Sequence, residues 1–354
     1  MTTFLQFHLL TTYGPSNPNR DDQGRQKQAT VGGVPRLRMS SQSVKRALRE
    51  STFFALDLAD HEGKRTKRLY ENLVEKLVGN GVSEDKAHAA ADQVAAIFGK
   101  LEAPDKATKN RISATLAFIS PEEWKLAGEL AEKIVAGEKA PPEKELKKLV
   151  LRRADGAVDI AMFGRMLADS PDYNRDAAVQ VAHAITTHQA QSEEDWFSAV
   201  DDLKKNEETG AGHLGEISFG SGVYYQYVCV NCDLLISNLA GDRELAVKAI
   251  EALAAALART APKGKQNSFA HHPLAHYILV EAGTQAPRDL SGAFFSPVRA
   301  QPLLEKSVEA LEKTRKDIDD GYGKVWKEEK KLHVGKGGTL DGIMAFAGAT
   351  VRGA

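Results

Sequence analysis

The residues of this chain best suited to chemistry lie in one basic block near the N-terminus, Asn19–Arg49. Residues 1–50 hold eight basic residues against three acidic ones, although the formal net charge of the whole chain is only −1. Helix N-terminal amides, hydroxyl groups and aligned cations can hold successive phosphates without touching bases. A solvated basic face remains the alternative interpretation. The candidate phosphate-binding residues are Arg20, Lys27, Ser40, Ser41, Gln42, Lys45, Arg46 and Arg49.

Two other groups of residues could be read as metal sites, and neither pattern is complete. Cys229 and Cys232 have C-x-x-C spacing, but they fall in an expected strand, and the chain has only these two cysteines. His271, His272 and His276 are interrupted by Pro273, and histidines at i and i+5 diverge on a helix. No phosphate-binding loop, nucleophile elbow or H-E-x-x-H motif occurs. The sequence therefore predicts no metal, no cofactor and no catalytic centre.

Composition limits the class of protein. The 354 residues are 42% hydrophobic and 27% charged, which is typical of a globular protein. The longest apolar run, at Ala252–Ala258, is too short to span a membrane. The opening MTTFLQFHLL lacks the basic start and cleavage site of a signal peptide, and two cysteines cannot form a disulfide scaffold. We expect a cytoplasmic protein.

The elements around the basic block can be predicted from local patterns. Thr3–Thr11 alternates as a strand, and Ala29–Met39 is typical of a hairpin around Gly32 and Gly33. A helix is predicted over Gln42–Leu56, with Ser40 or Ser41 as its cap. Its apolar residues Val44, Ala47, Leu48 and Ser51 lie opposite Gln42, Lys45, Arg46 and Arg49.

The rest of the chain alternates between helical and strand character. Residues 60–150 are almost purely helical, with a cap, a proline and a glutamate at Ser120-Pro121-Glu122-Glu123. Strands are expected at Ala157–Met162, Gly222–Asn231 and His276–Glu281, and a helix at Glu244–Thr260. This order predicts an α+β fold with a split βαβ core, ferredoxin-like or RRM-like, that carries a large helical insertion.

The stretch 190–216 is acidic, with eight acidic residues against Lys204 and Lys205. Ser192 followed by Glu193, Glu194 and Asp195 is typical of a helix start, and Trp196, Val200 and Leu203 make an apolar stripe. The stripe can either pack against the core or insert between bases. An acidic segment of this kind binds phosphates poorly.

Several motifs in the same order resemble one known family. SSQSVKRALR follows GGVPRLRM and NRDD, and further similarity occurs in GAVDIAMFGRM (156–166), AHAITTHQ (182–189), DWFSAVDDL (195–203) and, loosely, His213–Tyr227. These segments resemble the CasC family, the crRNA-binding backbone subunit of the type I-E CRISPR Cascade complex. The insertion and the last hundred residues match it less clearly.

The resemblance implies a hand-like protein with an RRM-like palm, a helical fingers insertion and a protruding thumb loop. The palm would comprise residues 1–58, 156–191 and 222–354, the last with the C-terminal segment, the fingers 59–155 and the thumb 192–221. Copies of the chain would line the spacer of the crRNA, each thumb displacing every sixth base and leaving the others free to pair with target DNA. The implied partners are crRNA, target DNA through the guide, further copies of the chain, and the large, small, 5′-handle-capping and crRNA-processing endoribonuclease subunits.

The same resemblance assigns roles to individual residues. It places RNA phosphates at the basic block, the RNA kink at Met166, and the displaced base near Trp196, Phe197 and Leu214. The RNP1 pattern of other RRM domains is absent. An alternative is an RNA-cleaving backbone subunit that uses a loop aspartate, Asp21 or Asp22; pairing of these acids with Arg20 and Arg25 is the simpler expectation.

Overall fold

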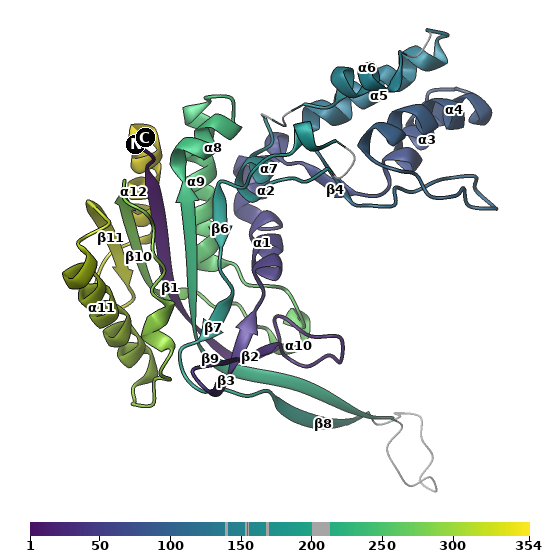
Figure 1. The fold of residues 1–354 in the computed structure, drawn as a ribbon. Helices are drawn as coiled ribbons and strands as arrows, with labels where there is room; N and C mark the ends of the chain where they lie inside the picture. The colour runs from purple at the N-terminus through teal and green to yellow at the C-terminus, as the bar shows by residue number, and fades with distance from the viewer. Residues whose placement is uncertain (139–140, 153, 155, 168–169, 200–212) are drawn as a thin grey trace, which may run out of the picture. The chain divides into compact units, whose positions relative to one another are not determined.

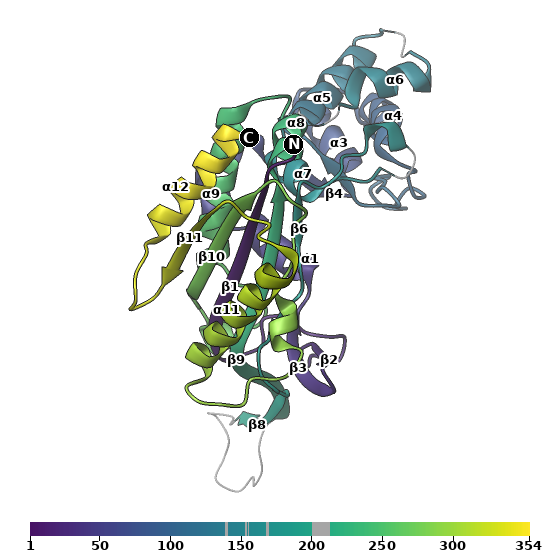
Figure 2. The same cartoon turned by 60° about the vertical axis from the view of Figure 1, so that its left-hand side comes forward.

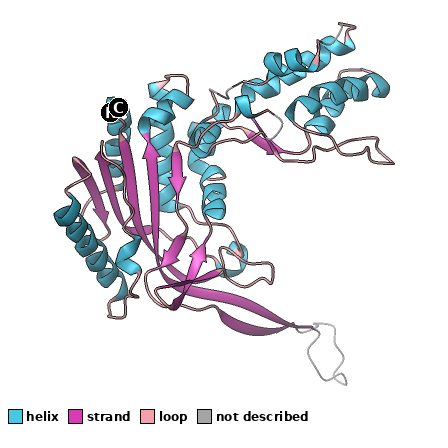
Figure 3. Ribbon diagram, in the orientation of Figure 1, coloured by secondary structure: helices cyan, strands magenta, loops and turns pink. Residues whose placement is uncertain are grey.

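The computed structural model describes residues 1–138, 141–152, 154, 156–167, 170–199 and 213–354 (Figure 1). It divides into two compact units. Unit 1 contains Met1–Ala55, Gln180–Asn231 and Ile250–Ala354, and unit 2 contains Leu56–Val179 and Cys232–Ala249. The first is built around a sheet and the second is mostly helical (Figure 3). The α+β class expected from the sequence is confirmed.

The described residues form a nine-stranded sheet whose main path runs β11-β10-β1-β9-β7-β3-β2. Strands β6 and β8 each pair with β9 outside that path. The pairings of β1 with β9 and with β10 are antiparallel and extend over most of β1. The strands are β1 (Phe4–Ser16), β2 (Gln28–Val31), β3 (Val34–Met39), β6 (Val179–Val181), β7 (Ala184–Thr186), β8 (Glu193–Ala199), β9 (His213–Asn231), β10 (Ala275–Gly283) and β11 (Glu328–His333).

Strand β1 is covered on both faces. The alternation of apolar and polar residues predicted for it therefore does not separate a buried face from a solvent-exposed face. Leu10 packs with Tyr225, Leu279 and Leu311 of α11 (Leu303–Tyr322) in one core cluster. Figure 2 shows α11 on one side of the sheet and α12 (Leu340–Gly353) on the other. Burial on both faces is typical of the central strand of a layered α+β fold.

Helix α1 (Ser41–Arg49) begins where local capping predicts. The Ser40 hydroxyl accepts a hydrogen bond from the Ser43 amide, and Val44, Ala47 and Leu48 are buried as expected. The predicted helix over Gln42–Leu56 is wrong in its second half, because the Ser51 hydroxyl accepts the Phe54 amide and starts a new helix. The helices with residues in this unit are α1 (Ser41–Arg49), α2 (Thr52–Asp57), η4 (Ser291–Phe294), α9 (Arg243–Arg259), α10 (Gln266–Phe269), α11 (Leu303–Tyr322) and α12 (Leu340–Gly353).

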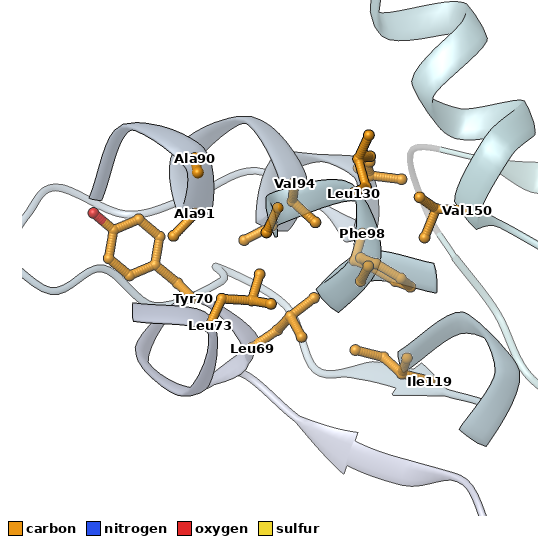
Figure 4. Packing of buried hydrophobic residues seen from close by; sticks show 14 of the residues in the cluster. Leu69, Tyr70, Leu73, Ala90, Ala91, Val94, Phe98, Ile119, Leu130 and Val150 are labelled. Carbon is orange, nitrogen blue, oxygen red and sulfur yellow. The ribbon is translucent and has the colours of Figure 1, made fainter. Parts of the chain in front are cut away.

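Unit 2 has its own core, made by its helices (Figure 4). Leu73, Val94, Phe98 and Leu130 are among its buried residues. The predicted capping box between Ser120 and Glu123 is present. The elements with residues in this unit are η1 (Ala59–His61), β4 (Lys64–Thr66), α3 (Leu69–Gly79), α4 (Glu84–Ala95), η2 (Ala96–Phe98), β5 (Ala117–Ile119), α5 (Pro121–Val135), α6 (Glu143–Val150), α7 (Val158–Phe163), η3 (Pro171–Tyr173) and α8 (Cys232–Asn238).

The strand expected at Ala157–Met162 is wrong, since Val158–Phe163 forms helix α7. All six residues of the expected strand are buried. In a short segment that is buried on every side, the hydrophobic periodicity cannot distinguish a helix from a strand. Asp159 lies inside this core, where its Oδ1 accepts the Gly63 amide at 2.8 Å. Gly164, at φ 80°, ends the helix in a conformation that glycine adopts easily.

One further expectation for secondary structure is wrong. The helix expected from Ser192 is strand β8, because the backbone of Glu193–Ala199 pairs with β9. Its predicted stripe residues Val200 and Leu203, with Lys204 and Lys205, lie outside the described residues. The C-terminal segment from Lys330, for which the sequence predicts no element, contributes to β11, whose residues pair with β10. Strands β8 and β11 both depend on a partner strand that their own residues do not indicate.

Candidate nucleic-acid interface

The loop that carries Arg20 and Lys27 is held by two asparagines. Asn17 is fully buried, and its Nδ2 donates to the Gly24 carbonyl at 3.0 Å and to the Ser218 carbonyl at 2.7 Å. Asn19 Oδ1 accepts the Ser40 amide at 2.8 Å, which joins the loop to the start of α1. The loop is thereby fixed at both its base and its tip.

Helix α1 presents two adjacent surfaces. Gln42, Lys45 and Arg49 share one arc of the helix, and Arg46 lies at its edge. Arg46 also lines a cavity of about 640 Å³, where it contacts Glu50 at 2.7 Å. Burial lowers the pKa of Lys45 from its usual value, since its ammonium is partly removed from water.

The cavity beside α1 has walls from three segments of unit 1. Its cationic lining includes Arg20, Arg46 and Lys263, and its acidic lining includes Asp21, Asp22 and Glu50. A Cβ on Gly264 would lie 2.4 Å from the Pro18 carbonyl oxygen, so this loop approaches the Asn17–Asn19 segment closely. The sequence contains no local signal for Lys263 here, because about 240 residues separate the two loops. Charges balance within the cavity, and the arc of α1 beside it is cationic.

A second cationic group lies along β3. Arg38 Nη1 lies 2.8 Å from His183 Nδ1, and the backbone carbonyl of Lys27 accepts the Arg38 amide. Burial, followed by the charges of Arg38 and Lys27, lowers the pKa of His183. His183 is therefore neutral near pH 7 and can accept from the guanidinium. Arg38 contributes to the basic charge of residues 1–50, but no local pattern in the sequence marks it as a binding residue.

Arg36 belongs to the core, although the sequence counts it among the basic residues. Its guanidinium is fully buried and donates to the carbonyls of Thr186 at 2.9 Å and Phe294 at 2.8 Å. It ties β7 to η4 and is inaccessible to a phosphate.

The thumb segment forms a β8–β9 hairpin. Trp196 is opposite Glu216 and is 72% exposed. Phe197 is opposite Gly215, where a Cβ would lie only 2.4 Å from the phenyl ring, so this pair is closely packed. The backbone of Leu214 pairs with Ser198. The middle of the expected thumb, residues 200–212, lies outside the described residues.

The hairpin is connected to the basic loop. Arg25 Nε lies 3.6 Å from Glu194 Oε1, and Asn17 contacts the Ser218 carbonyl. Hydrogen bonding and repulsion from Glu194 raise the pKa of the exposed Glu216. The described hairpin therefore presents an apolar Trp196 among carboxylates, which suits contact with a base better than contact with a phosphate.

Met166 is the one candidate that belongs to unit 2, where it is 80% exposed. The other described candidates all belong to unit 1.

Ser41 is the first residue of α1 and follows the cap residue Ser40. Its hydroxyl lies 3.4 Å from Gln42 Oε1.

Asp21, one of the two acids of the RNA-cleaving alternative, is engaged by the backbone of its own loop. Asp21 Oδ1 accepts the backbone amides of Gln23 and Arg25, each at 2.9 Å, and so closes the turn of the loop. The expected Asp–Arg pairing is absent from the ion pairs of the described residues. The role of Asp21 in this structure is to shape a turn.

The cysteines and histidines that could be read as metal sites lie in different surroundings from those expected. Cys229 lies near the end of β9 and Cys232 is the first residue of α8, so the two are not in one strand; both side chains are buried. Burial raises the pKa of Cys229 to about 11. His271 Nε2 lies 3.0 Å from the Pro262 carbonyl. In the described part of the chain, no three His, Cys, Asp or Glu side chains gather as a metal site. No helix among these residues is long and apolar enough to cross a membrane.

Comparisons with known proteins agree over nearly the full length. A chain of a solved "CRISPR RNA-guided surveillance complex, pre-nicking" is 28% identical, with a TM-score of 0.86, and the match covers 99% of this chain and 100% of that one. A second, from a "CRISPR RNA-guided surveillance complex", is 25% identical, with a TM-score of 0.75 and the same coverage. No protein with a curated description matches the chain. The profile described as "CT1975-like protein" matches residues 5–340, and the chain therefore belongs to the CT1975-like protein family.

Proposed function

We propose that the chain is the crRNA-binding backbone subunit of a CRISPR surveillance complex, of the CasC type found in type I-E Cascade. The full-length similarity to a chain of a CRISPR RNA-guided surveillance complex carries this proposal. Copies of the protein assemble along the spacer of the guide in the cytoplasm and present it for pairing with target DNA. The large, small, 5′-handle-capping and crRNA-processing subunits complete the complex.

The arrangement of unit 1 supports a grip on the RNA backbone. Lys45 and Arg49 lie in line on α1, and Arg20 and Lys27 lie on a loop fixed to the start of that helix. Contacts of this kind go to phosphates and carry no base specificity. A subunit that accepts any guide needs such contacts.

The hand-like division is part of the proposal. The RRM-like palm comprises residues 1–58, 156–191 and 222–354, the fingers 59–155 and the thumb 192–221. In this view Trp196 and Phe197 on β8, with Leu214, contact the displaced base, and Met166 lies at the kink of the RNA. The exposure of Trp196 and Met166 supports both assignments.

Electron microscopy of the protein co-expressed with a crRNA tests the assembly. We expect a filament or a complex of fixed stoichiometry whose length follows the length of the spacer. Monomeric particles with RNA bound at no fixed spacing would contradict the proposal and favour a general RNA chaperone.

We propose a role without catalysis. The Asp21 carboxylate is engaged by two backbone amides, which leaves it poorly placed as a base. Purified protein should therefore cut neither crRNA nor complementary RNA, with or without a divalent cation. Cleavage lost in Asp22→Asn and kept in Asp172→Asn, an exposed acid of unit 2, would establish the RNA-cleaving alternative instead.

A further inference from the structure

Unit 2 contains a cavity of about 610 Å³ outside the candidate interface. Strand β4, the first half of α3 and Trp124 of α5 line it. Figure 1 shows β4 next to the start of α3. A cavity of this size can hold a nucleotide.

Some charged side chains of this cavity form ion pairs with one another and others do not. Arg68 contacts Glu71 at 2.6 Å, which neutralises both side chains. Within the part of the chain that the structure describes, no ion pair includes Lys64 or Arg65. These two cations on β4 are available to an anion. Glu75 is the remaining acid of the lining, and it is exposed to water.

Trp124 supplies an aromatic surface beside these cations. The indole is partly buried against the helical core of unit 2, which fixes its orientation. The Lys64 ammonium lies 5.0 Å from the ring centroid. Among the described residues, neither the indole N–H nor the Asn72 side-chain amide has a hydrogen-bond partner. The cavity thus combines cations, a flat aromatic face and open polar groups.

We propose that this cavity binds single-stranded nucleic acid. A base stacks on Trp124 in place of the Lys64 ammonium, which moves with Arg65 to the adjoining phosphate. Stacking on an aromatic side chain beside a cationic track is the usual means of binding a single strand without sequence preference. An acidic peptide would use the two cations but would gain nothing from stacking on the indole. The inference goes beyond the proposed grip of unit 1 on the guide.

The test uses the full-length chain carrying Lys45→Ala, Arg49→Ala and Trp196→Phe, so that binding at α1 is weakened and the exposed indole of β8 cannot contribute to the fluorescence change. Titration with oligothymidylate should quench tryptophan fluorescence, and Trp124→Phe should remove that component of the quenching. Lys64→Ala with Arg65→Ala should weaken binding and reduce the slope of log K against log salt by about 0.7 for each lost phosphate contact. Lys133→Ala, an exposed lysine on the same helix as Trp124, is the matched control and should bind as the parent does.

Three results would overturn the inference. They are quenching that persists in Trp124→Phe, equal loss of binding in the Lys133→Ala control, and displacement of the oligonucleotide by polyglutamate at equal charge concentration. The last would show that the cavity recognises an acidic protein segment. If the variant with Lys64→Ala and Arg65→Ala fails to fold, as judged by circular dichroism, the conservative Trp124→Phe still tests whether the oligonucleotide binds at this cavity. Failure here would leave the assembly on crRNA untouched, because electron microscopy tests that separately.

Discussion

Asn17 donates a hydrogen bond from Nδ2 to the Ser218 carbonyl at 2.7 Å, across 201 positions of sequence. Its second amide hydrogen bonds to the Gly24 carbonyl, so one buried side chain holds the basic loop against the root of the β8–β9 hairpin. The proposed phosphate contacts and the proposed thumb thus share a single anchor.

This anchor gives a prediction with a defined order of effects. Asn17→Ala should lower the free energy of unfolding by about 1–3 kcal/mol, because two carbonyls lose a donor. Asn17→Asp should be worse, since a carboxylate would face those carbonyl oxygens. Urea unfolding measures the order, and an aspartate variant more stable than the alanine variant would contradict it. Asn267→Ala, an exposed asparagine of unit 1, is the control.

Removing two cations from α1 should weaken binding to crRNA. For Lys45→Ala with Arg49→Ala, the slope of log K against log salt should fall by about 0.7 for each lost phosphate contact. Lys313→Ala with Lys316→Ala removes two exposed cations from α11 and serves as the matched control. A filter-binding titration in which both pairs shift the slope equally would show that charge alone, and not this helix, matters.

Trp196 should act at the displaced base. Its indole is 72% exposed on β8, so Trp196→Ala should leave the fold intact but lose stacking worth about 1–3 kcal/mol per base. In an assembled complex, mismatches with target DNA should be tolerated at every sixth guide position and penalised elsewhere. Ser198→Ala on the same strand is the control, and uniform mismatch sensitivity in the unmodified protein would refute base displacement.

His8 should make the protein less stable in mild acid. It is fully buried, with Nδ1 3.0 Å from the Tyr225 hydroxyl and Nε2 3.4 Å from Glu281. Burial lowers the pKa of His8, and the charges of Arg288 and Arg315 act in the same direction. Because the folded pKa lies below the unfolded value of 6.5, the unfolded chain takes up the proton first. This contribution to stability is complete above the unfolded pKa and is lost as the pH falls below it, by at most about 1.4 kcal/mol per pH unit.

Comparison of His8→Gln with the parent protein measures the contribution of His8 to the pH dependence of the free energy of unfolding. The parent should lose more unfolding free energy than the glutamine variant between about pH 7.5 and about pH 5.5. His272→Gln, at an exposed histidine, should behave as the parent does. A parent protein that gains stability relative to His8→Gln in acid would show that His8 is protonated in the fold. Below this range Glu281 makes a contribution of the same sign: burial opposes its ionisation, but its contacts with His8 and Arg288 outweigh burial and lower its pKa.

Features that depend on neighbours in the chain could be predicted from sequence. The cap at Ser40, the buried stripe of α1 and the capping box at Glu123 each involve residues within about two helical turns, so local preferences decide them. The turn at Gly32 is similar, because both glycines there take positive φ. The candidate cations on α1 were found for the same reason.

Features that depend on distant partners were decided by the tertiary structure. β8 has the local pattern of a helix start, yet pairing with β9 satisfies its backbone and makes it a strand. Arg36 has the composition of a surface cation, yet carbonyls from Thr186 and Phe294 allow its burial. Lys263 reaches the cavity beside α1 only because Gly264 permits a close approach to Pro18. In each case the free energy comes from a contact between segments separated by many residues, which local propensity cannot report.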